Sequence, residues 1–367
     1  MKKGSLIVKL TIAMLLVSAA GAATQDLYFG GYVRNNTGVL INDELDYSQV
    51  QNTFDLKAEY YGDISELKAE VFINQTDTEE IEVGIKELYV DIFFDSMDLR
   101  IGKQQIIWGK ADGVFITDVI SPKDLSNFVL PDFDEVRMGV TALKANYYMD
   151  AVDIELVWIP KFTPAVMPED GTLWEVSKPI TLPSEPVYYV PGTTLDNSEL
   201  FTKMAYMGSV IDFELMGGYM WDDLPSIDSD GSGGFRADYS RVSMAGGSFS
   251  TDISGFIIRG EGAYYNGKNF TVQAAPVTTV EKDFINYMIG LDYSIAGFTL
   301  GTQFIQEIIL DYDDRIVFNY EFKNTMTFVV AKPFLNDTLM VEFFSYVGLT
   351  NEDALLRPKV TYDLADG

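Results

Sequence analysis

Charged side chains at alternate positions of otherwise apolar stretches are the residues through which this chain could act chemically. Side chains two apart on a β-strand point to the same face of a sheet, so these charges should share one wetted face. Charges that line a water-filled passage select ions by their sign, whereas charges that pair with each other stabilise a hydrated wall. Both interpretations stand for every residue predicted to line a pore: Lys57, Lys68, Glu70, Arg100, Lys144, Glu155, Arg259, Glu261, Arg357 and Lys359.

A second group of acids lies in residues 109–137, where large apolar residues such as Phe115 and Ile120 separate them. A fully exposed loop would have little need of these apolar side chains. We therefore expect the segment to pack against an inner wall and to constrict a passage, the alternative being a cap over its mouth. The acids assigned to this constriction loop are Asp112, Asp118, Asp124, Asp132 and Asp134.

The composition excludes most enzymatic chemistry. The 367 residues include no His and no Cys, which removes disulfides, the usual zinc sites, Ser-His-Asp triads and any His general base. We therefore expect no catalytic residue, no metal site and no cofactor. With 26 basic and 55 acidic residues the formal charge is −29, which opposes nucleic-acid binding and would favour cations mildly within a pore.

Period-two alternation continues through nearly the whole chain after residue 22. About sixteen strands can be traced, among them 27–34, 98–108 and 354–363, and many have the ~9–11 residues that a tilted strand needs to cross a bilayer. Short turns alternate with long connections, as in outer-membrane barrels, whereas a soluble β-sandwich has no reason for this pattern. We predict an all-β transmembrane antiparallel β-barrel, with these side chains pointing outward: Leu67, Val71, Ile154, Leu156, Phe213 and Leu215.

Both ends of the chain carry further expectations. Residues 1–22 combine Lys2 and Lys3, an apolar run over 6–20 and a small residue, Ala22, before the expected cleavage, which predicts a signal peptide. The barrel would then comprise 23–367. The last residues, 363–367, resemble the start of another turn, so we expect C-terminal truncation, eighteen strands in the complete protein and an unpaired gap between 27–34 and 354–363.

The stretch 100–110, RIGKQQIIWGK, resembles a G-[KR]-Q-x-I-x-W-G strand signature of an uncharacterised family of porin-like barrels from Gram-negative outer membranes. The segments 118–124, DVISPKD, and 356–362, LRPKVTY, resemble the family's following loop and a late strand. The resemblance implies an outer-membrane barrel with solute passage. Alternation fails at Lys103, which predicts a bulge near Gly102, the alternative being that Lys103 lies near the rim and reaches water. Trp108 is expected to be an interfacial anchor.

The expected function is a porin-like channel in the cell outer membrane for passive diffusion of small hydrophilic solutes, with residues 109–137 as its constriction. The partners would be these solutes, outer-membrane lipid and lipopolysaccharide. Two alternatives remain, namely a channel for hydrophobic or aromatic compounds and a plugged barrel with a structural or surface-recognition role. The sequence gives no expectation for the oligomeric state.

Overall fold

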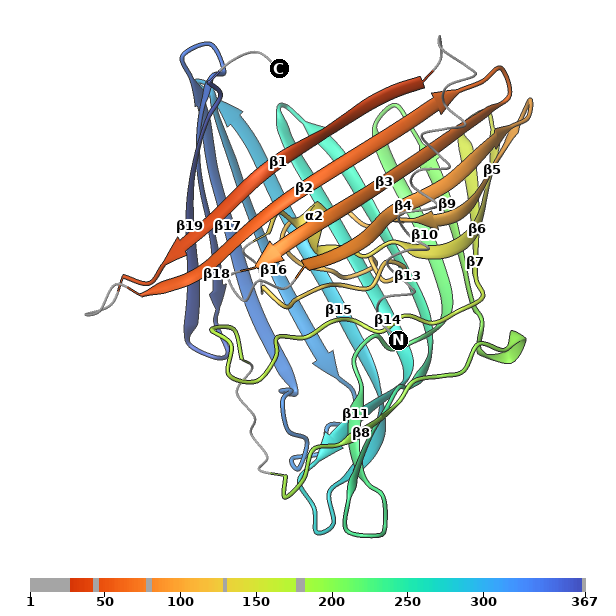
Figure 1. Cartoon of the computed structure of the whole chain (residues 1–367), viewed down its shortest axis with the longest axis vertical. Coiled ribbons are helices and arrows are strands. Elements are labelled where there is room, and N and C mark those ends of the chain that lie inside the picture. Colours follow the sequence, from red (N-terminus) through yellow and green to blue (C-terminus); the bar gives the residue numbers. More distant parts are fainter. Residues whose placement is uncertain (1–26, 42–45, 77–80, 128–130, 176–181, 365–367) are drawn as a thin grey trace.

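The protein is described from a computed structural model that covers residues 27–41, 46–76, 81–127, 131–175 and 182–364 (Figure 1). The predicted signal peptide over 1–22 and the side chain of Asp134 lie outside the described part. None of the helices in these ranges is long and apolar enough to cross a membrane. The elements are β1 (Leu27–Val39), β2 (Tyr47–Tyr61), β3 (Ser65–Thr76), β4 (Ile81–Phe93), β5 (Met97–Gln104), α2 (Phe133–Val136), β6 (Val140–Met149), β7 (Val152–Ile159), β8 (Val187–Tyr189), η2 (Leu195–Asn197), β9 (Glu199–Met207), β10 (Ile211–Trp221), β11 (Ser226–Ser229), β12 (Phe235–Asp238), β13 (Arg241–Ile253), β14 (Phe256–Val272), β15 (Thr278–Ile295), β16 (Phe298–Ile309), β17 (Phe322–Phe334), β18 (Leu339–Gly348) and β19 (Asp353–Tyr362).

Sixteen of these strands form one antiparallel sheet in chain order, in agreement with the predicted count and fold class. The sheet curls around an interior that contains α2 (Figure 1). A separate three-stranded sheet of β8, β11 and β12 lies within connections that the sequence analysis left without strands. These strands have only three or four residues, which is too short for alternation to reveal them.

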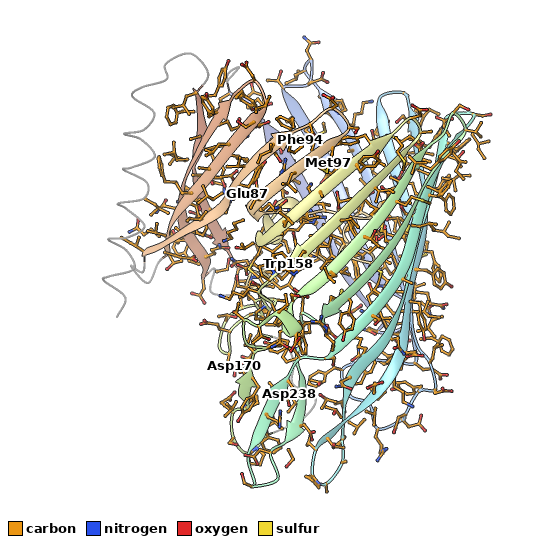
Figure 2. The ribbon with its side chains drawn as sticks, turned by 90° about the vertical axis from the view of Figure 1, so that its right-hand side faces the viewer. Glu87, Phe94, Met97, Trp158, Asp170 and Asp238 are labelled. Atoms are coloured by element: carbon orange, nitrogen blue, oxygen red, sulfur yellow. The ribbon has the colours of Figure 1, made fainter. Side chains whose placement is uncertain are left out.

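The two ends of the sheet differ, as the alternation of short and long connections predicted. Phe94 and Met97 mark a short turn at one end, closed by a 2.9 Å hydrogen bond from the Phe94 amide to the Met97 carbonyl (Figure 2). Asp170 and Asp238 lie at the opposite end, among the long connections and the small sheet (Figure 2). In outer-membrane barrels the short turns face the periplasm and the long loops face outward.

β1 and β19 are the two edges of the large sheet, and in the described part of the chain they share no backbone pairing. This arrangement agrees with the unpaired gap expected between 27–34 and 354–363. The count of eighteen strands stays a prediction.

The outer face of the sheet is apolar. Leu156 of β7 and Leu215 of β10 are more than half exposed, whereas the next residue of each strand, Val157 and Met216, is buried. Apolar side chains left bare along the outside of a sheet are typical of a wall that faces lipid, because only a hydrocarbon solvent favours them there.

The bulge predicted near Gly102 is wrong, because the ladder between β5 and β6 continues through Gly102 without a shift of register. The irregularity lies one strand away, where the β3–β4 register shifts between Glu70 and Val71 and leaves Lys86 without a partner position. β5 also ends at Gln104, four residues before its predicted end. Lys103, the next-to-last residue of β5, lines a cavity inside the sheet and donates to the Ile85 carbonyl at 2.5 Å.

Candidate pore and constriction loop

The described residues of the loop 109–137 run inside the sheet and are held to it by Glu261 of β14. The Glu261 carboxylate accepts hydrogen bonds from the amides of Lys110 (2.5 Å), Ala111 (2.9 Å) and Thr117 (2.7 Å) and from the Thr117 hydroxyl (2.7 Å). Only 5% of Glu261 is exposed, so these bonds are made away from water. Hydrogen bonds to a buried carboxylate are among the stronger ones in proteins, which makes Glu261 the main polar anchor of the loop.

Two neighbours of Glu261 on the wall extend this anchor. Arg259 donates to the Asp112 carboxylate at 2.6 Å and to the Lys110 carbonyl, and it also pairs with Asp292. Gln303 of β16 accepts from the Asp112 amide at 3.0 Å and donates to the Asp112 carbonyl at 2.8 Å. The start of the loop is therefore held on both its backbone and its side chains.

Next to these polar contacts the loop packs on an apolar part of the inner wall, whose strand residues are given below and which we call the apolar seat. Ile116 is fully buried, and it belongs to one core cluster with Trp108 and Ile120. The Tyr265 hydroxyl donates to the Ile116 carbonyl. The strands contribute these residues to the cluster: Val140, Ala142, Val157, Ile159, Phe201, Met216, Met220, Val242, Met244, Ala263, Tyr265, Met288 and Ile305. The inner wall from β6 to β16 is therefore apolar where the loop covers it, although the alternating charges predicted a wetted inner face.

Trp108 is not an interfacial anchor, and that prediction is wrong. Only 3% of it is exposed, and its indole nitrogen donates to Glu155 of β7 at 2.5 Å. Its ring meets Phe201 edge-on, with 6.1 Å between centroids. The reason is the early end of β5, after which the chain turns inward and carries Trp108 into the core cluster.

The segment 118–124 makes hydrogen bonds and an ion pair with other residues of the loop and with Ile106 just before it. Asp118 pairs with Arg137 at 2.7 Å, and Ser121 accepts a 2.8 Å bond from the Ile106 amide. The buried Lys123 ammonium donates to the Asp118 carbonyl at 2.8 Å, and burial lowers the pKa of Lys123. Burial also raises the pKa of Asp223, a nearby loop carboxyl. This segment therefore keeps the loop in one shape.

A polar cavity of about 800 Å³ remains on the other side of the loop. It lies between the loop, the first four strands and β19. It is lined by basic and acidic side chains, amides and hydroxyls, by two aromatic rings, and by four apolar side chains: Arg34, Lys86, Lys103, Arg137, Arg357, Lys359, Glu82, Asp124, Asp132, Glu135, Asn36, Gln49, Gln51, Asn74, Gln105, Asn127, Thr37, Thr53, Ser126, Tyr32, Phe72, Val83, Ile85, Pro131 and Met138. The interior is thus divided into a filled half and a polar, open half.

The loop touches both edges of the sheet across this cavity. Asp132 lies 2.8 Å from the Lys359 ammonium and 3.2 Å from the Arg357 guanidinium, both on β19. Glu135 lies 2.7 Å from Arg34 of β1. Of the acids assigned to the constriction loop, Asp112 and Asp132 therefore meet basic residues of the wall.

The other two described acids of that set do not meet the wall's bases. Asp118 is buried within the loop, and Asp124 lines the cavity and accepts a 3.0 Å bond from the Ser126 amide.

The remaining residues predicted to line a pore form ion pairs on the inner wall. Lys57 pairs with Glu59 at 2.5 Å, and Arg100 makes two bonds to Asp91 at 2.7 and 2.8 Å. Lys68 pairs with Glu87 (2.5 Å) and Glu70 (3.3 Å), Glu70 also pairs with Lys86 (3.3 Å), and Lys144 pairs with Glu155 (3.9 Å). This pairing is the arrangement described by the alternative interpretation, a stabilised hydrated wall.

The comparisons with known proteins agree with this architecture. Residues 18–341 match the model of a family described as "Protein of unknown function (DUF1302)". The chain belongs to this family. The match includes 100–110 and 118–124 but does not test the strand signature itself. No curated protein sequence matches the chain.

Solved structures share the fold at low sequence identity. OmpTΔL8, a loop deletion mutant of the Vibrio cholerae outer membrane protein OmpT, is 12% identical with a TM-score of 0.51 and covers 92% of this chain and 98% of its own. OmpF of Salmonella typhi, in a complex with daunomycin, is 10% identical with a TM-score of 0.50 and covers 92% and 96%. The family member described here therefore has the fold of an outer-membrane β-barrel of the porin type.

Several residues that build this site were missed by sequence reasoning. Arg34 lay at the end of its predicted strand, and Gln303, Tyr265 and Asp223 were not among the predicted site residues. Tyr265 and Gln303 contact loop residues 149 and 191 positions away in the chain. A polar residue at an inward position of an apolar stretch was the one available signal, and it does not name the partner.

Proposed function

We propose that the protein is a porin-like channel of the outer membrane through which small hydrophilic solutes diffuse passively, with residues 109–137 as its constriction. The observation that carries this proposal is the division of the interior. Glu261 and the apolar seat hold the loop on one half, and a polar cavity of about 800 Å³ is left on the other. No chemical step is involved, and the surrounding partners are outer-membrane lipid and lipopolysaccharide.

The polar lining favours this function over a channel for hydrophobic or aromatic compounds. The apolar inner side chains, such as Met216 and Met288, are covered by the loop. The cavity beside the loop is instead lined by charges, amides and hydroxyls. A water-soluble solute keeps its hydrogen bonds along such a lining, whereas an apolar solute meets only scattered apolar side chains there, such as Val83 and Met138.

The experiment that tests the proposal is conductance of the full chain in planar lipid bilayers. We expect stepwise current in potassium chloride, and we expect deletion of 114–134 to raise the conductance by widening the constriction. Deletion of 231–233, which leaves a two-residue Asp-Gly turn in the hairpin between β11 and β12, is the control and should leave the conductance unchanged. The absence of any current from inserted, folded protein would favour the plugged barrel with a structural or recognition role.

A further inference from the structure

Three basic side chains from the two edges of the sheet converge on one end of the loop. Arg357 and Lys359 alternate with outward residues of β19, and Arg34 comes from β1. All three line the polar cavity. Two carboxylates of the loop, Asp132 and Glu135, pair with these basic side chains.

The contacts of Asp132 show how this cluster holds a carboxylate. Both its oxygens lie within 3.0 Å of the Lys359 ammonium, and Arg357 donates to one of them at 3.2 Å. The side chain of Asp132 is 58% exposed, so solvent reaches the pair from the cavity. The hydrogen bond from Lys359 lowers the pKa of Asp132, which keeps the group ionised.

Arg34 makes only one hydrogen bond to the loop carboxylate Glu135. Its terminal nitrogen Nη1 donates to Glu135 at 2.7 Å, and its guanidinium lies 5.2 Å from the centroid of the Tyr32 ring. The Nε–H group is buried and has no acceptor among the described residues. The single bond to Glu135 therefore falls short of the two parallel N–H bonds with which a guanidinium binds a carboxylate best.

The rest of the cavity offers partners for hydroxyl groups. Amides from the first three strands line it, namely Asn36, Gln49, Gln51 and Asn74, together with the hydroxyl of Thr53. An amide and a hydroxyl each donate and accept hydrogen bonds, as a solute hydroxyl does. The cationic cluster and this amide surface belong to one cavity, so a single small molecule could meet both.

We propose that Arg34, Arg357 and Lys359 form a binding site for hydroxylated carboxylates, such as sugar acids, which compete with Asp132 and Glu135 for these three side chains. The site rests on the proposed function, since it selects among the solutes that the channel admits. It makes the passage locally favourable to anions, although the chain carries a formal charge of −29. The loop's carboxylates keep the cluster occupied until a solute arrives.

The test is interruption of single-channel current by added solute, with the full chain in potassium chloride. Sodium glucuronate is the probe, and glucose is its uncharged counterpart of nearly the same size. We expect glucuronate to interrupt the current and glucose at the same concentration to leave it steady. The double variant R357Q/K359Q should raise the half-blocking concentration of glucuronate by about tenfold or more, since two charged donors are lost.

The matched control is R236Q/R315Q, which removes the same charge from exposed residues far from the cavity and should leave the block unchanged. Arg34→Gln, on the opposite edge strand, tests the site independently and should also weaken the block. A steady current with glucuronate, or an unchanged block in R357Q/K359Q and Arg34→Gln, would overturn the site while the channel itself stands. A wild-type chain without current would overturn the channel and, with it, the site.

Discussion

Replacement of Glu261 by Gln should release the constriction loop from the wall. In the wild type each carboxylate oxygen accepts two bonds, Oε2 from the amides of Lys110 and Ala111 and Oε1 from the amide and hydroxyl of Thr117. A glutamine keeps one oxygen and puts an NH₂ group opposite the other two donors. Two charge-assisted hydrogen bonds are therefore lost, and at about 1.5–3 kcal/mol each the cost is about 3–6 kcal/mol.

This cost falls on the attachment of the loop, because the strands keep their own backbone pairing. An opening that becomes about 3–6 kcal/mol easier is populated roughly 10²–10⁴ times more often. The assay is hydrogen exchange at the amides of Lys110, Ala111 and Thr117 in the folded protein, and exchange there should accelerate within this range. Single-channel recordings should show added open-state noise.

The control for this variant is Glu281→Gln, which removes the same charge from an exposed position of β15. It should change neither the exchange nor the noise. If the three amides of Glu261→Gln exchange as slowly as in the wild type, Glu261 does not anchor the loop. The explanation of the constriction given above would then be wrong.

Two further predictions follow from the loop's contacts. Trp108→Ala should lower the free energy of unfolding in urea by about 3–5 kcal/mol, as expected for a buried Trp. Trp158→Ala, on the outer face of β7, should lower it clearly less. Equal decreases in the free energy of unfolding would contradict the burial of Trp108 in the core cluster. The contact of Asp132 with β19 depends on pH in one direction: because the pKa of Asp132 is lowered, the contact contributes fully above the ordinary aspartate value of 3.8 and is lost as the pH falls through the lowered pKa. Conductance should therefore stay constant from pH 5 to 7 and change only in strong acid, where Asp132 becomes protonated. Asp132→Asn should abolish this change. A change in conductance near neutral pH that Asp132→Asn removes would refute this assignment.

Much of the fold could be predicted from the sequence because strand alternation is local. Leu156 and Val157 differ in exposure as their positions in the alternation require, and the sixteen strands of the large sheet follow chain order. The boundaries were less accurate where polar residues continue a strand, as in β1, which extends to Val39 rather than ending near 34.

The site could be predicted only in part, since its contacts join residues far apart in the chain. The placement of 109–137 inside the sheet followed from the apolar residues between its acids. Its anchor did not, because Glu261 is one charge among many on alternating positions, and it contacts loop residues 144–151 positions away. Trp108 was misplaced for a related reason, namely that β5 ends where its inward contacts begin, and no local pattern marks that point.

The central claim, that solutes pass beside the loop and not beneath it, can be tested by introduced cysteines, since the chain has none of its own. Gln51→Cys places a thiol in the polar cavity, and Ala263→Cys places one under the loop, where Ala263 is 4% exposed. A charged, membrane-impermeant methanethiosulfonate reagent is added during single-channel recording. We predict that it reduces the current through Gln51→Cys and leaves Ala263→Cys unchanged. A reduced current in Ala263→Cys with an unchanged current in Gln51→Cys would contradict the proposed path.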